Sequence, residues 1–240
     1  MTAERPFFAT LVDHASAFFR PSGAFAYHYT RGKLGMDPIF HALLAQGLLS
    51  GRERILDLGC GQGSLFACLL AARVQADQGR WPAHWPPAPQ ARQLRGVELM
   101  PKDVARAAQA FAAHRNTVNI EQGDMCTTDF GEVDAVTILD ALHYFDHQGQ
   151  RAVLARIHAA LAPGGVFITR IGNAAAGWPF RLSQGVDHVV TFLRGHRLPR
   201  LYCRPLAEWV QLLEQTGFQV EVQSMSGRTP FANVMLIGRR

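Results

Sequence analysis

A short apolar strand that runs into a glycine-rich turn and then into a helix is the feature that most restricts how this chain folds. Residues 54–58 read as a buried strand, the turn follows as Gly59-Cys60-Gly61-Gln62-Gly63, and residues 64–74 favour a helix. Glycine tolerates the positive φ angles of such a turn and lets the backbone approach a ligand without a Cβ in the way. A turn at the carboxyl end of a first strand predicts a ligand crevice in an open α/β sheet.

The same strand-and-helix rhythm continues along the chain. Further apolar strands are expected at 94–98, 118–121, 133–139 and 166–171, with helices between them, and two last strands at 218–223 and 232–237. Continuous apolar runs are typical of parallel strands buried on both faces. We therefore expect an α/β, Rossmann-like, seven-stranded, mostly parallel sheet with an antiparallel C-terminal hairpin strand and helices on both faces.

Four regions follow from the organisation of the sequence. Residues 1–50 are expected to form a helical cap or lid, in which Asp37 caps a helix that Pro38 opens. Residues 51–240 are expected to form the catalytic domain. Residues 75–93 are rich in Pro and Trp, which excludes a helix interior and predicts an inserted surface loop. Residues 172–204 form a longer connection than usual, which predicts a cap over the substrate.

The residues around the glycine turn exclude two common kinds of nucleotide site. A dinucleotide fingerprint requires a third glycine where this chain has Ser64 or Phe66, and no lysine-bearing phosphate loop is present. Instead, the stretch from Asp57 to Gly63 resembles the D-x-G-x-G-x-G motif of class I S-adenosylmethionine-dependent methyltransferases. The Leu-Ala-Pro-Gly-Gly turn at 161–165 is similar to the turn that precedes the fifth strand in that family.

This resemblance implies S-adenosylmethionine as cofactor and S-adenosylhomocysteine as product. It places Glu98 on the ribose hydroxyls, although Glu98 follows Gly63 at a wider spacing than usual, and it places Asp124 on the adenine amino group. The implied cofactor-binding set is Asp57, Gly59, Cys60, Gly61, Gly63, Glu98, Leu99, Asp124, Met125, Asp140 and Ala141. Structural alternatives stand beside these roles: Asp57 could hold the turn, Asp124 and Asp140 could form Asx turns, and Cys60 could be a small filler.

Two further residues are candidates on chemical grounds. Arg31 lies in a polar and aromatic stretch at 27–33, which we expect to lie over the cofactor with Arg31 or Lys33 near its carboxylate, and an ordinary linker is the alternative. His143 follows Asp140 by three residues and is the candidate general base for an O- or C-methylation, with a purely structural histidine as the alternative.

The charge and the cysteine content of the chain give information on its methyl acceptor and its cellular location. The net charge is +5, but arginines are spread along the chain apart from those at 194, 197, 200 and 204. The four cysteines show no metal-ligand spacing, and no apolar run reaches the length of a membrane span. We therefore expect a cytoplasmic protein with no metal and no membrane span.

A small-molecule acceptor is favoured over nucleic acid. The segment after the fourth strand begins Asp140-Ala141-Leu142, which lacks the Pro-Pro pair of enzymes that methylate amino groups of nucleic acids. Segments at 31–34, 194–198 and 229–233 resemble methyltransferases of bacterial aryl-polyene and fatty-acid-like pathways, which implies an aromatic acceptor or one on an acidic carrier protein. An RNA methyltransferase, a nicotinamide-binding protein and a non-catalytic cofactor binder are the open alternatives.

Overall fold

The computed structural model describes residues 4–172, 201–225 and 233–240. The chain forms two compact units, Met1–Thr128 and Asp129–Arg240, and each is described by itself. Most of the expected substrate cap and the arginines at 194, 197 and 200 lie outside the described residues. The division into a helical cap of residues 1–50 and a catalytic domain therefore stays a prediction.

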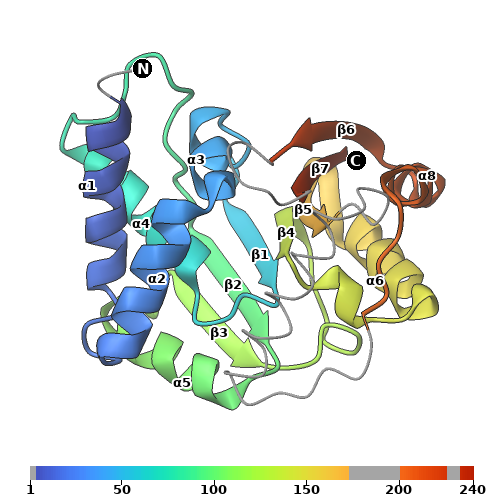
Figure 1. The fold of residues 1–240 in the computed structure, drawn as a ribbon, viewed down its shortest axis with the longest axis horizontal. Coiled ribbons are helices and arrows are strands. Elements are labelled where there is room, and N and C mark those ends of the chain that lie inside the picture. The colour runs from blue at the N-terminus through green and yellow to red at the C-terminus, as the bar shows by residue number, and fades with distance from the viewer. Residues whose placement is uncertain (1–3, 173–200, 226–232) are drawn as a thin grey trace. The chain divides into compact units, whose positions relative to one another are not determined.

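The first unit contains three parallel strands together with the N-terminal helices and the helices that connect the strands (Figure 1). Strand β2 lies between β1 and β3, with Asp57 opposite Gly96 and Gly96 opposite Ile120. The elements of this unit, in chain order, are α1 (Glu4–Ala17), α2 (Ala24–Met36), α3 (Pro38–Ala45), β1 (Arg54–Leu58), α4 (Ser64–Asp77), β2 (Gln93–Glu98), α5 (Pro101–Ala110) and β3 (Val118–Gln122).

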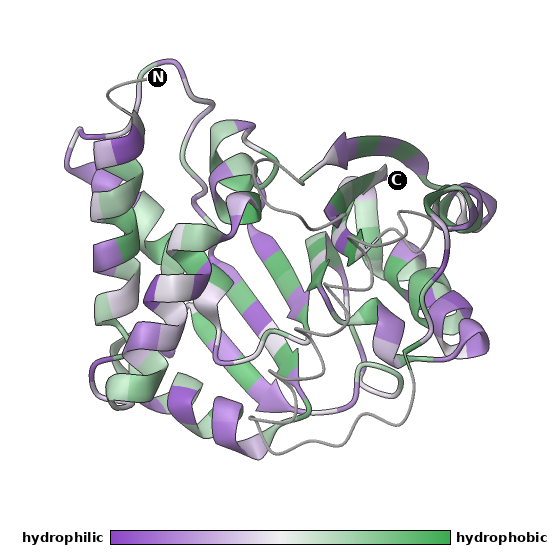
Figure 2. Cartoon of the chain, viewed as in Figure 1, coloured by the Kyte–Doolittle hydropathy of each residue, from purple (hydrophilic) through white to green (hydrophobic). Residues whose placement is uncertain are grey.

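Helix α2 occupies the stretch for which a linker was the alternative. Its buried residues are Ala26, Thr30 and Leu34, a four-residue spacing that places them on one face of the helix. Helix α3 begins as expected, because the Asp37 side chain accepts a hydrogen bond from the Ile39 N–H and Pro38 stands at its first position. Figure 2 shows that α1 carries both hydrophilic and hydrophobic residues, and of these Leu11, Val12 and Ala15 are buried.

The Pro- and Trp-rich insertion is packed on helices instead of lying on the surface throughout. Helix α4 extends to Asp77, so the insertion begins at residue 78. Trp85 is buried and contacts the rings of Phe7 in α1 and His41 in α3 edge to face, at 5.5 and 5.1 Å between centroids. Trp81 contacts Phe7 in the same way and donates its indole N–H to the Pro86 carbonyl. Aromatic contacts thereby hold the insertion against the N-terminal helices.

The second unit contains β4 (Val133–Leu139), α6 (His147–Ala160), β5 (Leu161–Gly172), α8 (Leu206–Thr216), β6 (Gln219–Ser224) and β7 (Asn233–Arg239). Strand β4 is parallel to β5, whereas β7 is antiparallel to both β5 and β6. Strand β5 begins five residues earlier than expected. It includes the Pro163-Gly164-Gly165 stretch because Leu161 already pairs with Val133, and the register shifts before Ala135 pairs with Val166.

All seven strands belong to one sheet, in the order β3-β2-β1-β4-β5-β7-β6. Parallel pairing of β1 with β2, of β2 with β3 and of β4 with β5, together with antiparallel pairing at the C-terminus, confirms the predicted mostly parallel sheet. Most of the buried residues of β1, β4 and β5 are aliphatic or aromatic, as expected for strands covered on both faces. Among the helices in the described ranges, none is long and apolar enough to cross a membrane.

Candidate active site

The glycine turn is attached to the neighbouring strand by its own backbone. Gly59 and Cys60 both donate their N–H groups to the Val97 carbonyl of β2, at 2.8 and 3.3 Å. Gly59, Gly61 and Gly63 have φ angles of 73°, 57° and 87°, a region in which other residues are strained. At Gly63 a Cβ would also lie 2.7 Å from Ile120 and Phe111. The turn therefore requires glycine for both backbone and space.

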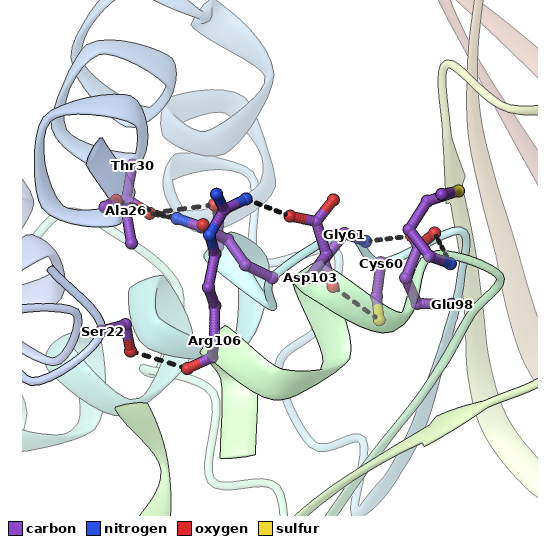
Figure 3. A network of polar contacts seen from close by, with 11 residues as sticks. Ser22, Ala26, Thr30, Cys60, Gly61, Glu98, Asp103 and Arg106 are labelled. Carbon is purple, nitrogen blue, oxygen red and sulfur yellow. Dashed lines mark hydrogen bonds and ion pairs between the residues drawn. The ribbon is translucent and has the colours of Figure 1, made fainter. Parts of the chain in front are cut away.

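Glu98 connects the end of β2 to this turn (Figure 3). One carboxylate oxygen accepts the Gly61 N–H at 2.7 Å and the other accepts the Met100 N–H at 2.9 Å. The side chain is 8% exposed. A carboxylate can accept about four hydrogen bonds. Each oxygen thus retains capacity for one more donor, beside a turn that leaves the backbone accessible.

Leu99, Asp124 and Met125 follow β2 and β3. Leu99 is 62% exposed and Met125 is buried. The Asp124 side chain accepts the Cys126 N–H at 2.8 Å, and its carbonyl accepts the N–H groups of Thr127 and Thr128. The Asx turn considered for Asp124 is thus present, and its contact with adenine stays a prediction.

Asp57 and Cys60 are both buried in this unit. Burial raises the pKa of the Cys60 thiol well above its usual range, and the charges of Asp57 and Glu98 raise it further. The thiol is therefore protonated at neutral pH, which suits a small packing residue and not a nucleophile. The ligand roles of Asp57 and Cys60 stay predictions.

Arg31 lies on the outer side of α2. It donates to Asp13 of α1 at 2.8 Å, and its side chain is 53% exposed. The neighbouring residue Thr30 is on the buried stripe, and each residue advances the helix by about 100°. A contact between Arg31 and the cofactor, which stays a prediction, would require this ion pair to break.

Asp140 combines an unusual backbone with a partly buried ion pair in the second unit. Its φ is 64°, and no other described residue except glycine has a positive φ. Its carboxylate accepts from Arg170 of β5, one bond measuring 2.6 Å from Nε to Oδ1, and the Arg170 side chain is 9% exposed. Aspartate is among the few residues that tolerate this conformation. Strain of this kind is often found at functional sites.

His143 and Ala141 lie in the segment after β4. Ala141 is buried, and the buried Nε2 of His143 has no hydrogen-bond partner among the residues described. Burial lowers the pKa of His143, although the charge of Asp140 opposes this. The imidazole is therefore neutral at pH 7 and able to accept a proton, as a general base must.

A buried glutamine holds this segment in place. Gln150 of α6 donates its amide to the carbonyls of Leu142, Phe145 and Tyr202, and its amide oxygen accepts from Arg204 at 2.7 Å. The Tyr202 N–H also donates to the His143 carbonyl at 2.8 Å. The residues on both sides of the candidate base are thus anchored by hydrogen bonds.

The sequence had also suggested no metal ligands. Within the described ranges, no group of three or more His, Cys, Asp or Glu side chains is suited to hold a metal ion.

The structure adds three polar residues that the sequence reasoning missed, namely Gln62, Thr30 and Arg170. Of these, only Arg170 could have been found from the sequence, because an arginine inside an apolar strand requires a polar partner.

Comparison with known protein families identifies a domain that part of this chain resembles. Residues 56–167, which include the glycine turn, Glu98, Asp124 and Asp140, match the model of a methyltransferase domain. This part of the chain is similar to a methyltransferase domain, in agreement with the resemblance to class I S-adenosylmethionine-dependent methyltransferases. The resemblance carried by the stretch from Asp57 to Gly63 is thereby confirmed.

A curated relative matches part of this chain. The chain is 32% identical to carboxy-S-adenosyl-L-methionine synthase of Chromohalobacter salexigens over 130 residues, which cover 52% of this chain and 42% of that protein. The chain therefore matches less than half the length of this curated relative.

Solved structures match this chain over more of its length. Magnesium protoporphyrin IX methyltransferase of Synechocystis PCC 6803, solved with bound S-adenosylhomocysteine, has a TM-score of 0.59 at 19% identity and covers 100% of this chain and 99% of its own. An O-methyltransferase family protein of Burkholderia thailandensis has a TM-score of 0.61 at 18% identity, covering 92% of this chain and 61% of its own. At these identities the likeness shows a shared fold.

Proposed function

We propose that this protein binds S-adenosylmethionine and transfers its methyl group to an oxygen or carbon atom of a small organic acceptor. The observation that carries the proposal is Glu98, whose two oxygens are held by the N–H groups of Gly61 and Met100. The carboxylate is thereby presented beside the glycine turn with acceptor capacity for two vicinal hydroxyls. A ribose ring offers such a pair.

The residues of the first unit fit the parts of this cofactor. Glu98 would hold the ribose, the glycine turn would give close access to the backbone, and exposed Leu99 would pack on the adenine ring. The cofactor supplies an electrophilic methyl group on a sulfonium. The chain has to orient an acceptor atom in line with that methyl group and to exclude water.

His143 is the proposed base for an acceptor that must lose a proton. Its buried Nε2 and lowered pKa keep it neutral, and Tyr202 and Gln150 anchor its segment. Two of the structural neighbours are named for small-molecule acceptors, magnesium protoporphyrin IX and mitomycin, which supports a small acceptor. The proposal extends to an acceptor that is either free or bound to an acidic carrier protein, and to a location in the cytoplasm.

Ligand-dependent thermal stability tests the proposal. A ligand that binds the native state raises the melting temperature, by an amount that grows with its concentration relative to its Kd. We expect S-adenosylmethionine and S-adenosylhomocysteine each to raise the melting temperature of the protein, and NAD to leave it unchanged. Stabilisation by NAD alone would overturn the proposal, as would no response to any of the three. Steeply salt-dependent binding of RNA would favour the alternative RNA acceptor.

The lowered pKa of His143 predicts a pH-dependent loss of stability. Between its folded pKa and the ordinary value of 6.5, the unfolded chain binds more protons than the folded one, so stability is complete above pH 6.5 and falls as pH decreases. We expect His143→Gln to flatten the curve of unfolding free energy between pH 6.5 and 5, relative to the wild type. Parallel curves from urea titrations would contradict the lowered pKa.

The catalytic role of His143 has its own readout. Once an acceptor is found, we expect His143→Gln to reduce kcat by roughly 100-fold, in line with the usual contribution of a general base. The Kd for S-adenosylhomocysteine should stay within about twofold, since the base contacts the acceptor and not the cofactor. His147→Gln, a change four residues away on the exposed start of α6, is the matched control. Unchanged turnover by His143→Gln would remove His143 from the mechanism.

A further inference from the structure

Gln62, which lies between Gly61 and Gly63 in the glycine turn, is almost completely buried, and only the nitrogen of its side-chain amide has hydrogen-bond partners among the described residues. It is 1% exposed. Its Nε2 donates to the Ala26 carbonyl at 2.8 Å and to the Thr30 hydroxyl at 2.6 Å. Its Oε1 is buried and has no hydrogen-bond partner among the described residues. A buried acceptor without a donor carries an energetic penalty, which a ligand that brings a donor would remove.

The orientation of this amide is determined by its surroundings. A carbonyl oxygen can only accept, so the Gln62 nitrogen, and not its oxygen, must face Ala26. Exchanging the two atoms would set two acceptors against each other. The atom left without a partner is therefore an acceptor, and its complement is a hydrogen-bond donor.

Helix α2 holds Gln62 in this state. Thr30, fully buried, accepts from Gln62 and also lies 3.3 Å from the Ser64 hydroxyl at the first residue of α4. Figure 3 shows Thr30 and Ala26 on neighbouring turns of α2, both reached by dashed contacts. The buried stripe of α2 thus pins the side chain of a residue whose backbone neighbours, Gly61 and Gly63, form the cofactor turn.

We propose that Gln62 Oε1 accepts a hydrogen bond from the α-ammonium group of the bound cofactor, with Thr30 as the residue that positions it. The inference rests on the proposed function. S-Adenosylhomocysteine has three kinds of donor: the ribose hydroxyls, the adenine amino group and the ammonium. Glu98 is assigned to the hydroxyls and the region of Asp124 to the adenine, which leaves the ammonium. A charged donor forms the stronger type of hydrogen bond with a buried amide oxygen.

Three ligands separate the groups of the cofactor in a calorimetric binding test. S-Adenosylhomocysteine carries both ammonium and carboxylate, its decarboxylated form keeps only the ammonium, and 5′-methylthioadenosine has neither. Gln62→Met keeps the length of the side chain and removes its polar atoms. We expect this variant to bind the first two ligands about tenfold more weakly, because it loses one hydrogen bond to a charged group. Its affinity for methylthioadenosine should stay within about twofold of wild type.

Thr30 variants provide the second measurement, independent of whether Gln62→Met folds. Thr30→Val removes the hydroxyl at nearly equal volume, and we expect about threefold weaker binding of the two ammonium-bearing ligands, since one of two contacts to Gln62 is lost. Thr30→Ser retains the hydroxyl and should restore wild-type affinity. That rescue separates positioning of the amide from packing of α2.

Two results would overturn the inference while leaving the proposed function intact. One is an equal loss for all three ligands, which would mean that Gln62 acts only through the shape of the turn. The other is a loss for S-adenosylhomocysteine alone, which would show that the substitution disturbs the site of the carboxylate and not that of the ammonium. Failure of the wild-type protein to bind any of the three ligands would instead refute the proposed function.

Discussion

Replacing Glu98 by glutamine is expected to weaken the binding of S-adenosylhomocysteine by about 100-fold. Hydrogen bonds to a charged group contribute roughly 1.5–3 kcal/mol each, and the substitution converts two such bonds to the ribose into weaker ones. It also turns an N–H of the new amide toward the N–H of Gly61 or Met100, which Glu98 now satisfies at 2.7 and 2.9 Å. Isothermal titration calorimetry measures the change directly.

A matched control for this substitution lies one strand away. Glu121 of β3 is opposite Val97 in the sheet and pairs with Arg95 at 2.6 Å, partly exposed to solvent. Glu121→Gln removes the same charge without touching the glycine turn, and we expect its affinity to stay within about twofold of wild type, because partly exposed ion pairs contribute little. If Glu98→Gln bound the cofactor as tightly as Glu121→Gln does, the ribose assignment would be wrong.

Gly63→Ala should cost about 3–4 kcal/mol of unfolding free energy. A left-handed φ of 87° accounts for about 1–2 kcal/mol in a residue with a Cβ, and overpacking accounts for a further 1–3 kcal/mol. The new methyl group would lie 2.7 Å from Ile120 and from Phe111, both of which belong to packed parts of the first unit. Urea unfolding followed by tryptophan fluorescence gives the difference.

Gly79 separates the two contributions. It has a φ of +67°, lies just beyond α4 in the same unit, and has open space within 4 Å of the place that a Cβ would take. Gly79→Ala should therefore show only the backbone cost of about 1–2 kcal/mol. Equal losses for Gly63→Ala and Gly79→Ala would show that the contacts with Ile120 and Phe111 relax without cost.

The sheet and its glycine turn could be predicted because their signals are local. Apolar runs such as 133–139 stand out from their surroundings, and only glycine suits the backbone at positions 59, 61 and 63. The start of α3 at Asp37-Pro38 could be predicted for the same reason, since helix capping depends on residues that are neighbours in the sequence. The early start of β5 was not, because it depends on pairing between Leu161 and Val133, which are far apart in the sequence.

The polar contacts of the site were harder to predict, since they depend on which side of each helix is buried. The stretch 27–33 drew attention for its charged residues, yet the buried stripe of α2 contains Thr30, while Arg31 meets Asp13. The contact of Trp85 with Phe7 likewise joins residues distant in sequence and has no local pattern. Asp140 was found as a strand end, but its left-handed backbone and its partner Arg170 appear only in three dimensions.

The hydrogen bonds between α2 and Gln62 limit how this chain can be shortened or recombined. A protein trimmed to start at β1 would leave the Gln62 amide group facing the space that Ala26 and Thr30 occupied, with two donors to satisfy instead of none. Chimaeras that exchange the first fifty residues with those of a relative would need a hydroxyl and a helical carbonyl at the same two places. The N-terminal helices are in this sense part of the architecture of the turn, and their sequence should vary together with residue 62.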